Sequence, residues 1–200
     1  ALADLLRKHP NLKFTVRSGN YPVFENEIRE NRCDIYVGYP PAYVPPDLHL
    51  DEITLPTPLI VCAKEHPLLK EASVSLNEAI RYPIITSALP AWYVDWAKHQ
   101  LGYTQSAFPV EQLSVLEADS IPMTVEIVKN SSALTAALPT DLMNELSSGD
   151  LRKIKLVNWP AIMPGCIITK LGKSHTPGET LFGEALRNQV KSEISLRRSF

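Results

Sequence analysis

The stretch that decides the fold is Leu59-Ile60-Val61-Cys62-Ala63-Lys64-Glu65-His66-Pro67-Leu68. It opens with an unbroken apolar run, the pattern of a strand that is buried on both faces. Lys64, Glu65 and His66 mark the change to solvent, and Pro67 ends the strand because it offers no N–H to a ladder. Since one αβα pattern precedes this stretch and another follows it, we predict a strand that crosses between two domains. The alternative is an ordinary core strand followed by a turn.

The rest of the chain alternates short apolar strands with amphipathic helices, which predicts α/β layers. A second apolar run, Pro164-Gly165-Cys166-Ile167-Ile168-Thr169, is expected to carry the chain back. Crossings near Ala63-Lys64 and near Cys166-Ile167 would divide the chain into a first lobe of 1–63 plus 168–200 and a second lobe of 64–167. Further strands are expected at 12–16, 33–38, 83–86, 113–116, 133–138 and 151–157, with helices starting near Ser75, Asp119-Ser120, Pro139 and Thr176.

The composition is that of an ordinary globular chain, with 44% hydrophobic residues and a formal net charge of -2. This charge leaves no strongly basic face for nucleic acid. No apolar run reaches the ~18 residues of a membrane span. Because Ala1 opens inside a helical pattern, we expect the chain to belong to a longer protein. The three cysteines sit far apart in apolar runs, which favours free thiols in a reducing compartment over a disulfide framework or a zinc site: Cys33, Cys62 and Cys166.

The sequence contains no catalytic or cofactor motif. The eight glycines are scattered and form no phosphate loop. Ser87 lacks the flanking glycines of a nucleophile elbow, and Trp92 and Trp96 are interpreted as core packing rather than as a stacking face. The isolated histidines are interpreted as surface residues: His9, His49, His99 and His175. We therefore expect neither an enzyme nor a bound cofactor or metal.

Small polar residues at strand ends and helix starts are the candidates for ligand binding: Ser18-Gly19-Asn20, Thr86-Ser87 and Asp119-Ser120. In open α/β sheets a ligand lies beyond the carboxyl ends of the strands, where helix N-termini favour an anion. Hydroxyl groups add neutral donors there. The alternative in each case is a turn or a helix cap, and capping alone explains Asp119 and Ser120. For Thr86 and Ser87 we favour a ligand role, because they end an apolar strand without a cap signature.

Several short motifs occur in order along nearly the whole chain: Asn31-Arg32-Cys33-Asp34-Ile35-Tyr36-Val37-Gly38, His66-Pro67-Leu68, Ala136-Ala137-Leu138-Pro139, Gly149-Asp150-Leu151 and Thr176-Pro177. Together they resemble the effector-binding domain of LysR-type transcriptional regulators. The resemblance implies the fold of the type II periplasmic binding proteins, in which two Rossmann-like lobes are joined by two crossover strands and hold an effector in the cleft between them. It implies that Thr86 and Ser87 line the second lobe's wall and Ser18-Gly19-Asn20 the first lobe's, with Asp119-Ser120 at the border.

The same resemblance implies a cytoplasmic regulator in which a small effector, here expected to be anionic, biases lobe closure and so alters DNA contacts. It implies a homodimer, and a tetramer for the full-length protein, with DNA bound only through a domain that precedes Ala1. In the dimer, the helix with Leu2, Leu5 and Leu6 would lie beside the helix with Met123, Ile127 and Val128 of the other copy. The alternative is a solute-binding protein of a transporter. An upstream helix-turn-helix or a signal peptide would distinguish the two.

Two features depart from the family pattern. Asn130, Ser131 and Ser132 stand where the family has a glycine pair shortly before Ala136. The family's first strand and the loop after it, which commonly supplies effector contacts, would precede Ala1. We therefore expect part of the effector site to lie outside this sequence.

Overall fold

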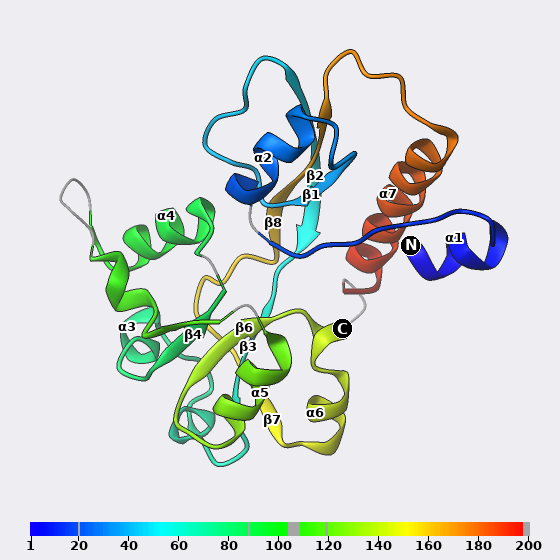
Figure 1. Cartoon of the computed structure of the whole chain (residues 1–200). Helices are drawn as coiled ribbons and strands as arrows, with labels where there is room; N and C mark the ends of the chain where they lie inside the picture. Colours follow the sequence, from blue (N-terminus) through cyan, green and yellow to red (C-terminus); the bar gives the residue numbers. More distant parts are fainter. Residues whose placement is uncertain (20, 88, 104–108, 119, 198–200) are drawn as a thin grey trace. The chain divides into compact units, whose positions relative to one another are not determined.

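The computed structural model of the 200-residue chain describes every residue except 20, 88, 104–108, 119 and 198–200. The chain divides into two compact units (Figure 1). Unit 1 comprises Ala1–Pro56 and Ile162–Phe200, and unit 2 comprises Thr57–Ala161. Each unit has a sheet of its own with helices packed on it, which confirms the predicted α/β class.

Unit 1 is built on a three-stranded antiparallel sheet with the order β1-β8-β2. Strands β2 and β8 pair along their whole length, from Leu48 opposite Lys170 to Pro56 opposite Ile162. This ladder joins segments that are far apart in the sequence and so closes the unit. The strands are β1 (Tyr36–Gly38), β2 (Leu48–Pro56) and β8 (Ile162–Lys170).

Helix α2 (Tyr21–Arg29) packs onto this sheet. Its buried residues Tyr21, Phe24 and Ile28 are three and four positions apart and therefore lie on one face of the helix. They form an apolar cluster with Cys166 and Ile168 of β8, both of which are fully buried.

Helices α1 (Leu2–Lys8) and α7 (Pro177–Arg197) also belong to unit 1 and contact each other. The segment that follows α1 runs as a long extended trace (Figure 1) but pairs with no described strand, so the strand predicted at 12–16 is absent. A strand needs a neighbour to satisfy its N–H and C=O groups. Phe14 in this segment instead contacts Phe182 of α7, with the ring centroids 6.3 Å apart.

Unit 2 is built on a five-stranded mixed sheet with the order β5-β4-β6-β3-β7. Strand β4 runs parallel to β5 and β6, whereas β3 runs antiparallel to β6 and β7. The strands are β3 (Leu59–Ala63), β4 (Ile84–Thr86), β5 (Leu116–Glu117), β6 (Leu134–Ala137) and β7 (Leu151–Ile154). The α-helices are α3 (Leu76–Ala79), α4 (Ala91–Gln100), α5 (Ile121–Lys129) and α6 (Met143–Ser148), and the 3₁₀ helices are η1 (Pro67–Lys70), η2 (Val110–Leu113) and η3 (Pro139–Asp141).

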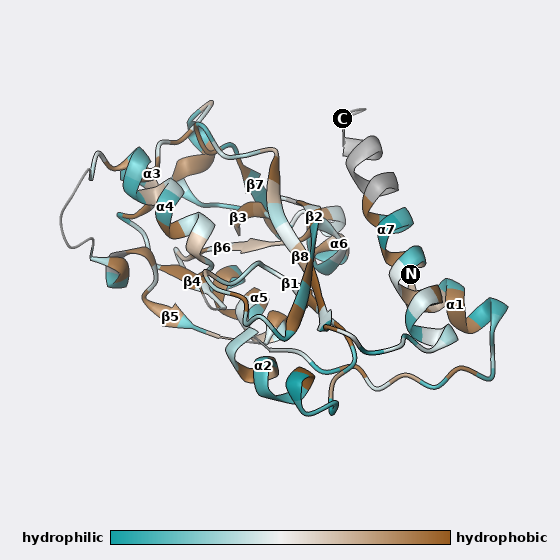
Figure 2. Cartoon of the chain, turned by 90° about the horizontal axis from the view of Figure 1, so that it is seen from above, coloured by the Kyte–Doolittle hydropathy of each residue, from teal (hydrophilic) through white to brown (hydrophobic). Residues whose placement is uncertain are grey.

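Strand β3 is buried on both faces, as predicted. Its adjacent residues Val61 and Cys62 are both fully buried, and each belongs to a different apolar cluster. Val61 packs with Val128 of α5, whereas Cys62 packs with Leu68 and Ile154. In Figure 2, β3 carries the colour of apolar residues.

The division of the chain differs from the expected one of 1–63 with 168–200 and 64–167. The chain leaves unit 1 after Pro56 and returns to it at Ile162, so both passages precede the strands that were expected to carry them. Strand β3 is hydrogen-bonded on both sides within unit 2, and β8 lies between β1 and β2 in unit 1. Strand β3 is therefore an ordinary core strand of unit 2, which is the alternative given in the sequence analysis. An apolar run predicts that a strand is buried, but it does not predict which sheet the strand joins.

His66 is buried, although the sequence placed it at the change to solvent. Its Nδ1 accepts the backbone N–H of Leu68 at 3.2 Å and so caps η1. Its Nε2 lies 3.2 Å from the carbonyl oxygen of Ser132, and its ring packs 4.5 Å from that of Tyr82. Because a carbonyl oxygen only accepts, Nε2 carries the proton in this arrangement.

Candidate functional site

The carboxyl end of β4 presents the predicted pair Thr86 and Ser87. Thr86 is the last residue of the strand and is partly buried, and Ser87 follows it and is exposed. The Oγ1 hydroxyl of Thr86 donates to Oγ of Ser114 at 3.0 Å. Ser114 precedes β5 and is 28 positions away in the sequence, so no local pattern linked it to Thr86.

Ser114 determines what Thr86 can offer to a ligand. Its Oγ lies 3.0 Å from the carbonyl oxygen of Leu116 and 3.4 Å from that of Ile84. Since carbonyl oxygens only accept hydrogen bonds, the Ser114 hydroxyl donates its one hydrogen bond to one of these two carbonyls. The Ser114 oxygen therefore accepts the hydrogen bond from the Thr86 hydroxyl. The proton of the Thr86 hydroxyl is therefore engaged by Ser114, and its oxygen keeps lone pairs that can accept hydrogen bonds.

Ser120 lies at the start of α5, close in sequence to the end of β5. It is the N-cap residue, and its side chain accepts the N–H of Met123 at 3.4 Å, which confirms the predicted cap. Thr86 pairs with Glu117 in the parallel ladder, and its carbonyl accepts the N–H of Ala118 at 2.8 Å. The structure thus brings Thr86, Ser87 and Ser120 to the carboxyl ends of adjacent strands. The predicted residues Asn20 and Asp119 lie outside the described residues.

Ser18 and Gly19 lie in unit 1, where they line a cavity of about 700 Å³. A Cβ atom on Gly19 would lie 3.0 Å from the ring of Phe24, so a side chain there would require that ring to shift slightly. The two predicted groups, Ser18-Gly19 and Thr86-Ser87, consequently belong to different units. The apolar lining of the cavity comprises Leu2, Leu12, Phe14, Val16, Phe24, Ile35, Val37 and Phe182.

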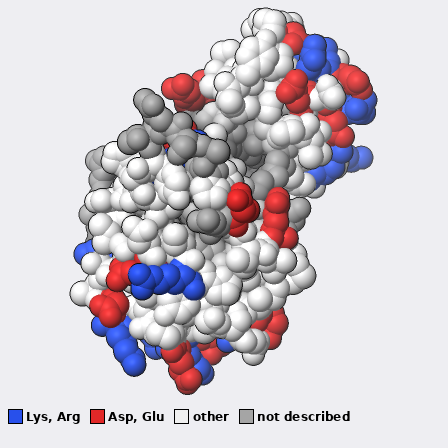
Figure 3. Space-filling model, turned by 90° about the vertical axis from the view of Figure 1, so that its left-hand side faces the viewer, with Lys and Arg blue, Asp and Glu red and all other residues white. Residues whose placement is uncertain are grey.

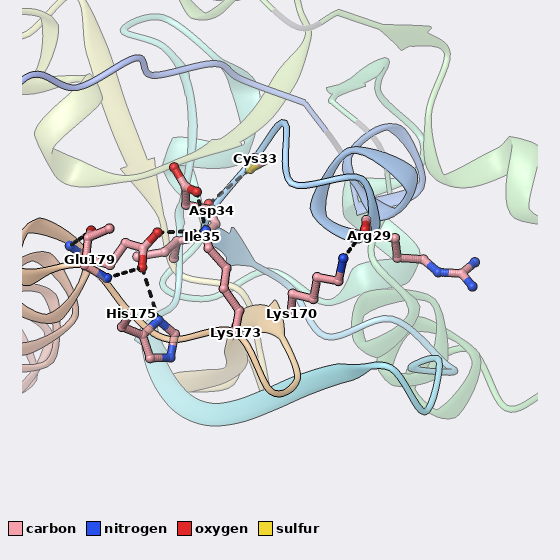
Figure 4. A network of polar contacts seen from close by, with 9 residues as sticks. Arg29, Cys33, Asp34, Ile35, Lys170, Lys173, His175 and Glu179 are labelled. Carbon is pink, nitrogen blue, oxygen red and sulfur yellow. Dashed lines mark hydrogen bonds and ion pairs between the residues drawn. The ribbon is translucent and has the colours of Figure 1, made fainter.

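A polar network borders this cavity at the start of α7 (Figure 4). The Nζ of Lys173 donates to the carboxylate of Asp34 and, at 2.8 Å, to Oε1 of Glu179. Glu179 also accepts the backbone N–H of Thr176 at 2.7 Å and lies 3.4 Å from Nδ1 of His175. The network ties the first turn of α7 to the segment before β1.

The ionisation of this network follows from its contacts. Burial alone would raise the pKa of Glu179, but the hydrogen bonds from Lys173 and from the Thr176 backbone outweigh it and leave that pKa below its ordinary value. Burial likewise opposes the charge of Lys173, yet its bonds to Asp34 and Glu179 raise the pKa of the ammonium group above its ordinary value. Both groups are therefore charged at neutral pH.

The cysteines do not form a reactive or metal-binding group. Cys33, Cys62 and Cys166 are all free thiols, as predicted. Burial raises the pKa of Cys62 and of Cys166 to about 11, which makes both poor nucleophiles at neutral pH. Among the described residues, no three His, Cys, Asp or Glu side chains gather as metal ligands would.

On the face that Figure 3 shows, Lys and Arg alternate with Asp and Glu, and neither sign forms a continuous patch. None of the helices in the described part of the chain is both long and apolar enough to cross a membrane.

Comparison with known families identifies the domain. The sequence model of the LysR substrate binding domain matches residues 1–191. The chain therefore belongs to the LysR substrate-binding domain family, and its fold is of the type II periplasmic-binding-protein class.

Individual relatives are distant in sequence. The chain is 29% identical over 86 residues to the HTH-type transcriptional activator CmpR of Synechocystis sp. (strain ATCC 27184 / PCC 6803 / Kazusa), a match that covers 42% of this chain and 27% of CmpR. The matched part of this chain thus spans about a quarter of the length of that relative.

Solved structures share the fold over nearly the whole chain. The regulatory domain of Synechocystis PCC6803 CcmR, in complex with 2-PG, is 16% identical with a TM-score of 0.72, covering 95% of this chain and 89% of that one. The effector binding domain of QuiR, in complex with shikimate, is 12% identical with a TM-score of 0.68, covering 96% of this chain and 88% of that one.

Proposed function

We propose that this chain is the ligand-sensing domain of a cytoplasmic LysR-type transcriptional regulator. The observation that carries the proposal is the family match over residues 1–191. The CcmR and QuiR domains, which share the fold, were crystallised with 2-PG and shikimate, and this supports a small-molecule effector here. The family match favours this role over a transport-associated solute-binding protein, and no catalytic role is proposed.

Within unit 2, the effector would contact Thr86 and Ser87 at the end of β4, near Ser120 at the start of α5. The exposed Ser87 hydroxyl and the N–H of Ile121 can donate to an anionic group. Pro122 has no N–H, and the N–H groups of Met123 and Thr124 already donate to Ser120. Thr86, whose own proton is held by Ser114, would accept a hydrogen bond. We therefore propose an anionic effector that also carries a donor, such as a hydroxyl group. Ser18, Gly19 and Asn20 would contribute from unit 1.

The regulator would assemble as a homodimer through α1 and α5, and as a DNA-binding tetramer once its N-terminal domain is included. The exposed apolar residues on these helices are Leu6, with 49% of its surface exposed, and Met123, with 49%, followed by Ile121 with 36%. Val128 is fully buried and belongs to the core of unit 2. Leu6 and Met123 are therefore the residues through which the pairing can be tested.

A thermal-shift screen tests the proposed function. The full-length protein is heated with a panel of small hydroxy-carboxylates, phosphate esters and uncharged polyols. At ~100 times its Kd, an effector adds about 2.7 kcal/mol to the free energy of unfolding by mass action and raises the Tm by several degrees. We expect hits among the anionic hydroxy compounds. If only uncharged compounds bind, the proposed effector class is wrong.

A further inference from the structure

The two passages of the chain between the units meet at one contact inside unit 2. The chain enters this unit at Thr57 and leaves it after Ala161. Close to both ends, the indole Nε1 of Trp159 donates a hydrogen bond of 2.9 Å to the carbonyl oxygen of Pro58, across 101 positions of the sequence. Pro58 is buried and Trp159 is partly buried. One side chain therefore ties the two ends of unit 2 together.

The segments that lead from this contact to unit 1 are short and stiff. In unit 1, the ladder of β2 and β8 ends with Pro56 opposite Ile162. Between that pair and the indole contact lie only residue 57 on one segment and residues 160–161 on the other. The prolines at 58 and 160 also restrict the backbone of the residue that precedes each of them. A movement of the indole relative to Pro58 therefore reaches the paired strands of unit 1 through very few rotatable bonds.

Helix α4 surrounds the indole of Trp159 with aromatic rings. The ring of Trp96 lies edge-on to it, with the centroids 4.9 Å apart, and the rings of Trp92 and Tyr93 follow at 5.8 Å and 5.9 Å. Edge-on pairs at such distances are favourable arrangements of aromatic rings. Because all three rings belong to one helix, a shift of α4 changes all three contacts of the indole at once.

Helix α4 also holds the backbone that presents Trp159. The indole Nε1 of Trp96 donates to the carbonyl oxygen of Asn158 at 2.9 Å, and the side-chain amide of Asn158 donates to Oε1 of Gln100 at 3.0 Å. Asn158 has a φ of 57°, in the left-handed region that residues with a side chain seldom adopt. Two hydrogen bonds with α4 therefore maintain the unusual conformation of the residue that precedes Trp159.

The same helix begins close to the proposed effector site. It starts at Ala91, shortly after Ser87 in the sequence. Its N-cap residue is Pro90, which has no polar side chain to cap the helix. The position of α4 thus depends on the packing of its side chains, and an occupant of Thr86 and Ser87 acts on a segment joined directly to it.

We infer that Trp159 is a latch that couples effector binding to the two passages, with α4 as the connecting element. This inference rests on the proposed function, because it assigns a mode of regulation to the same site. An anion at Thr86 and Ser87 is attracted by the positive end of the α4 dipole and so favours the arrangement in which α4 packs on Trp159. In that arrangement the bond to Pro58 is kept and both passages are restrained. Without the anion the latch opens more often.

A covalently attached anion tests the inference without a known effector. In the full-length protein with Cys33→Ser, a Ser87→Cys variant is modified with sulfonatoethyl methanethiosulfonate or with propyl methanethiosulfonate, an uncharged reagent of similar length. Cys62 and Cys166 are buried and should not react, and peptide masses verify the site of modification. Hydrogen exchange is then followed at the amides of residues 57 and 161–162. These amides should exchange about 10-fold more slowly in the sulfonate adduct than in the propyl adduct.

The same two adducts of a Trp159→Phe variant distinguish a latch from simple packing. Phenylalanine retains an aromatic ring but has no N–H for the carbonyl oxygen of Pro58, so the two adducts should exchange alike at the passages. If Trp159 only filled space, the difference between the adducts would remain. The amides of β6, which should be equally protected in every form, report that the protein is folded. If Trp159→Phe does not fold, Trp96→Phe, which loses the bond to Asn158, replaces it with the same expected result.

Two outcomes would overturn the inference. One is equal exchange of the two adducts in the protein that retains Trp159, and the other is a difference between the adducts that persists in the folded variant. The thermal-shift screen decides the proposed function separately, because the adducts require no affinity for an effector.

Discussion

The hydroxyl of Thr86 donates to the hydroxyl of Ser114 across 3.0 Å. This contact connects the end of β4 to the segment before β5 and orients the hydroxyl of Thr86. Ser114 in turn donates a hydrogen bond to a backbone carbonyl oxygen. Whether Thr86 offers a donor or an acceptor to a ligand thus depends on Ser114, which is not itself among the proposed ligand contacts.

Replacing Ser114 with alanine should destabilise unit 2 modestly. The change removes the acceptor of Thr86 and the donor to Leu116, so we expect a loss of about 1 kcal/mol in the free energy of unfolding. Urea titration followed by circular dichroism measures it. Ser73→Ala, an exposed serine in the same unit, is the matched control and should change little. Equal stability of the two variants would show that the hydroxyl chain is not formed.

Variants of His66 should separate hydrogen bonding from packing. His66→Leu leaves the N–H of Leu68 and the carbonyl of Ser132 without partners, at a cost of about 1–3 kcal/mol in the free energy of unfolding. His66→Asn retains an acceptor near the position of Nδ1 and should recover part of that loss. Chemical denaturation of both variants gives the comparison. If His66→Leu were as stable as the wild type, the imidazole would be filling space only.

The network at α7 should make stability depend on pH at both ends of the scale. The pKa of Glu179 is lowered in the folded state, so its stabilisation is present above its ordinary pKa of 4.5 and is lost as the pH falls through the lowered value. The pKa of Lys173 is raised, so its contribution is present below its ordinary 10.5 and is lost as the pH rises through the raised value. Glu179→Gln should flatten the acid limb of the Tm profile.

The control for this experiment is Glu184→Gln on the same helix, an exposed carboxylate for which no ion pair is found among the described residues. Its acid limb should follow that of the wild type. An unchanged acid limb in Glu179→Gln would contradict the assignment of the pH dependence to this network.

A charged residue introduced on α5 should dissociate the proposed dimer if it replaces an exposed residue of the helix. Met123→Glu adds a carboxylate to a residue that is 49% exposed and should halve the mass measured by light scattering while the circular dichroism spectrum is kept. Val128→Glu buries an unpaired charge in the core and should unfold unit 2 instead. Val157→Glu, an exposed site outside α5, serves as control. If Met123→Glu kept the wild-type mass, α5 would be excluded as the interface.

Local patterns in the sequence predicted the secondary-structure elements better than they predicted which strands pair with one another. The apolar run of β3 indicated burial on both faces correctly, because burial follows from side-chain chemistry. Its place in the middle of the unit 2 sheet depends on pairing with β6 and β7, and no short pattern specifies those partners. The alternation at 12–16 suggested a strand, yet that segment has no described neighbour to pair with.

The candidate site was predicted in the same uneven way. Thr86 and Ser87 could be proposed as site residues because they interrupt an apolar pattern at the end of a strand. Ser114 could not, because its role arises from a contact over 28 positions. His66 was misplaced because a histidine after charged residues is usually exposed, and its burial depends on a carbonyl group that the fold brings to it.

The most direct test is a calorimetric titration of the strongest hit from the thermal-shift screen into three forms of the full-length protein. They are the wild type, a Thr86→Val/Ser87→Ala double variant and the Ser73→Ala control. If the pair holds the effector, losing its hydrogen bonds should weaken binding by about 1–3 kcal/mol, which raises the Kd roughly 5- to 150-fold, while Ser73→Ala keeps the wild-type Kd. A folded double variant that binds the effector with the wild-type Kd would contradict the proposed site.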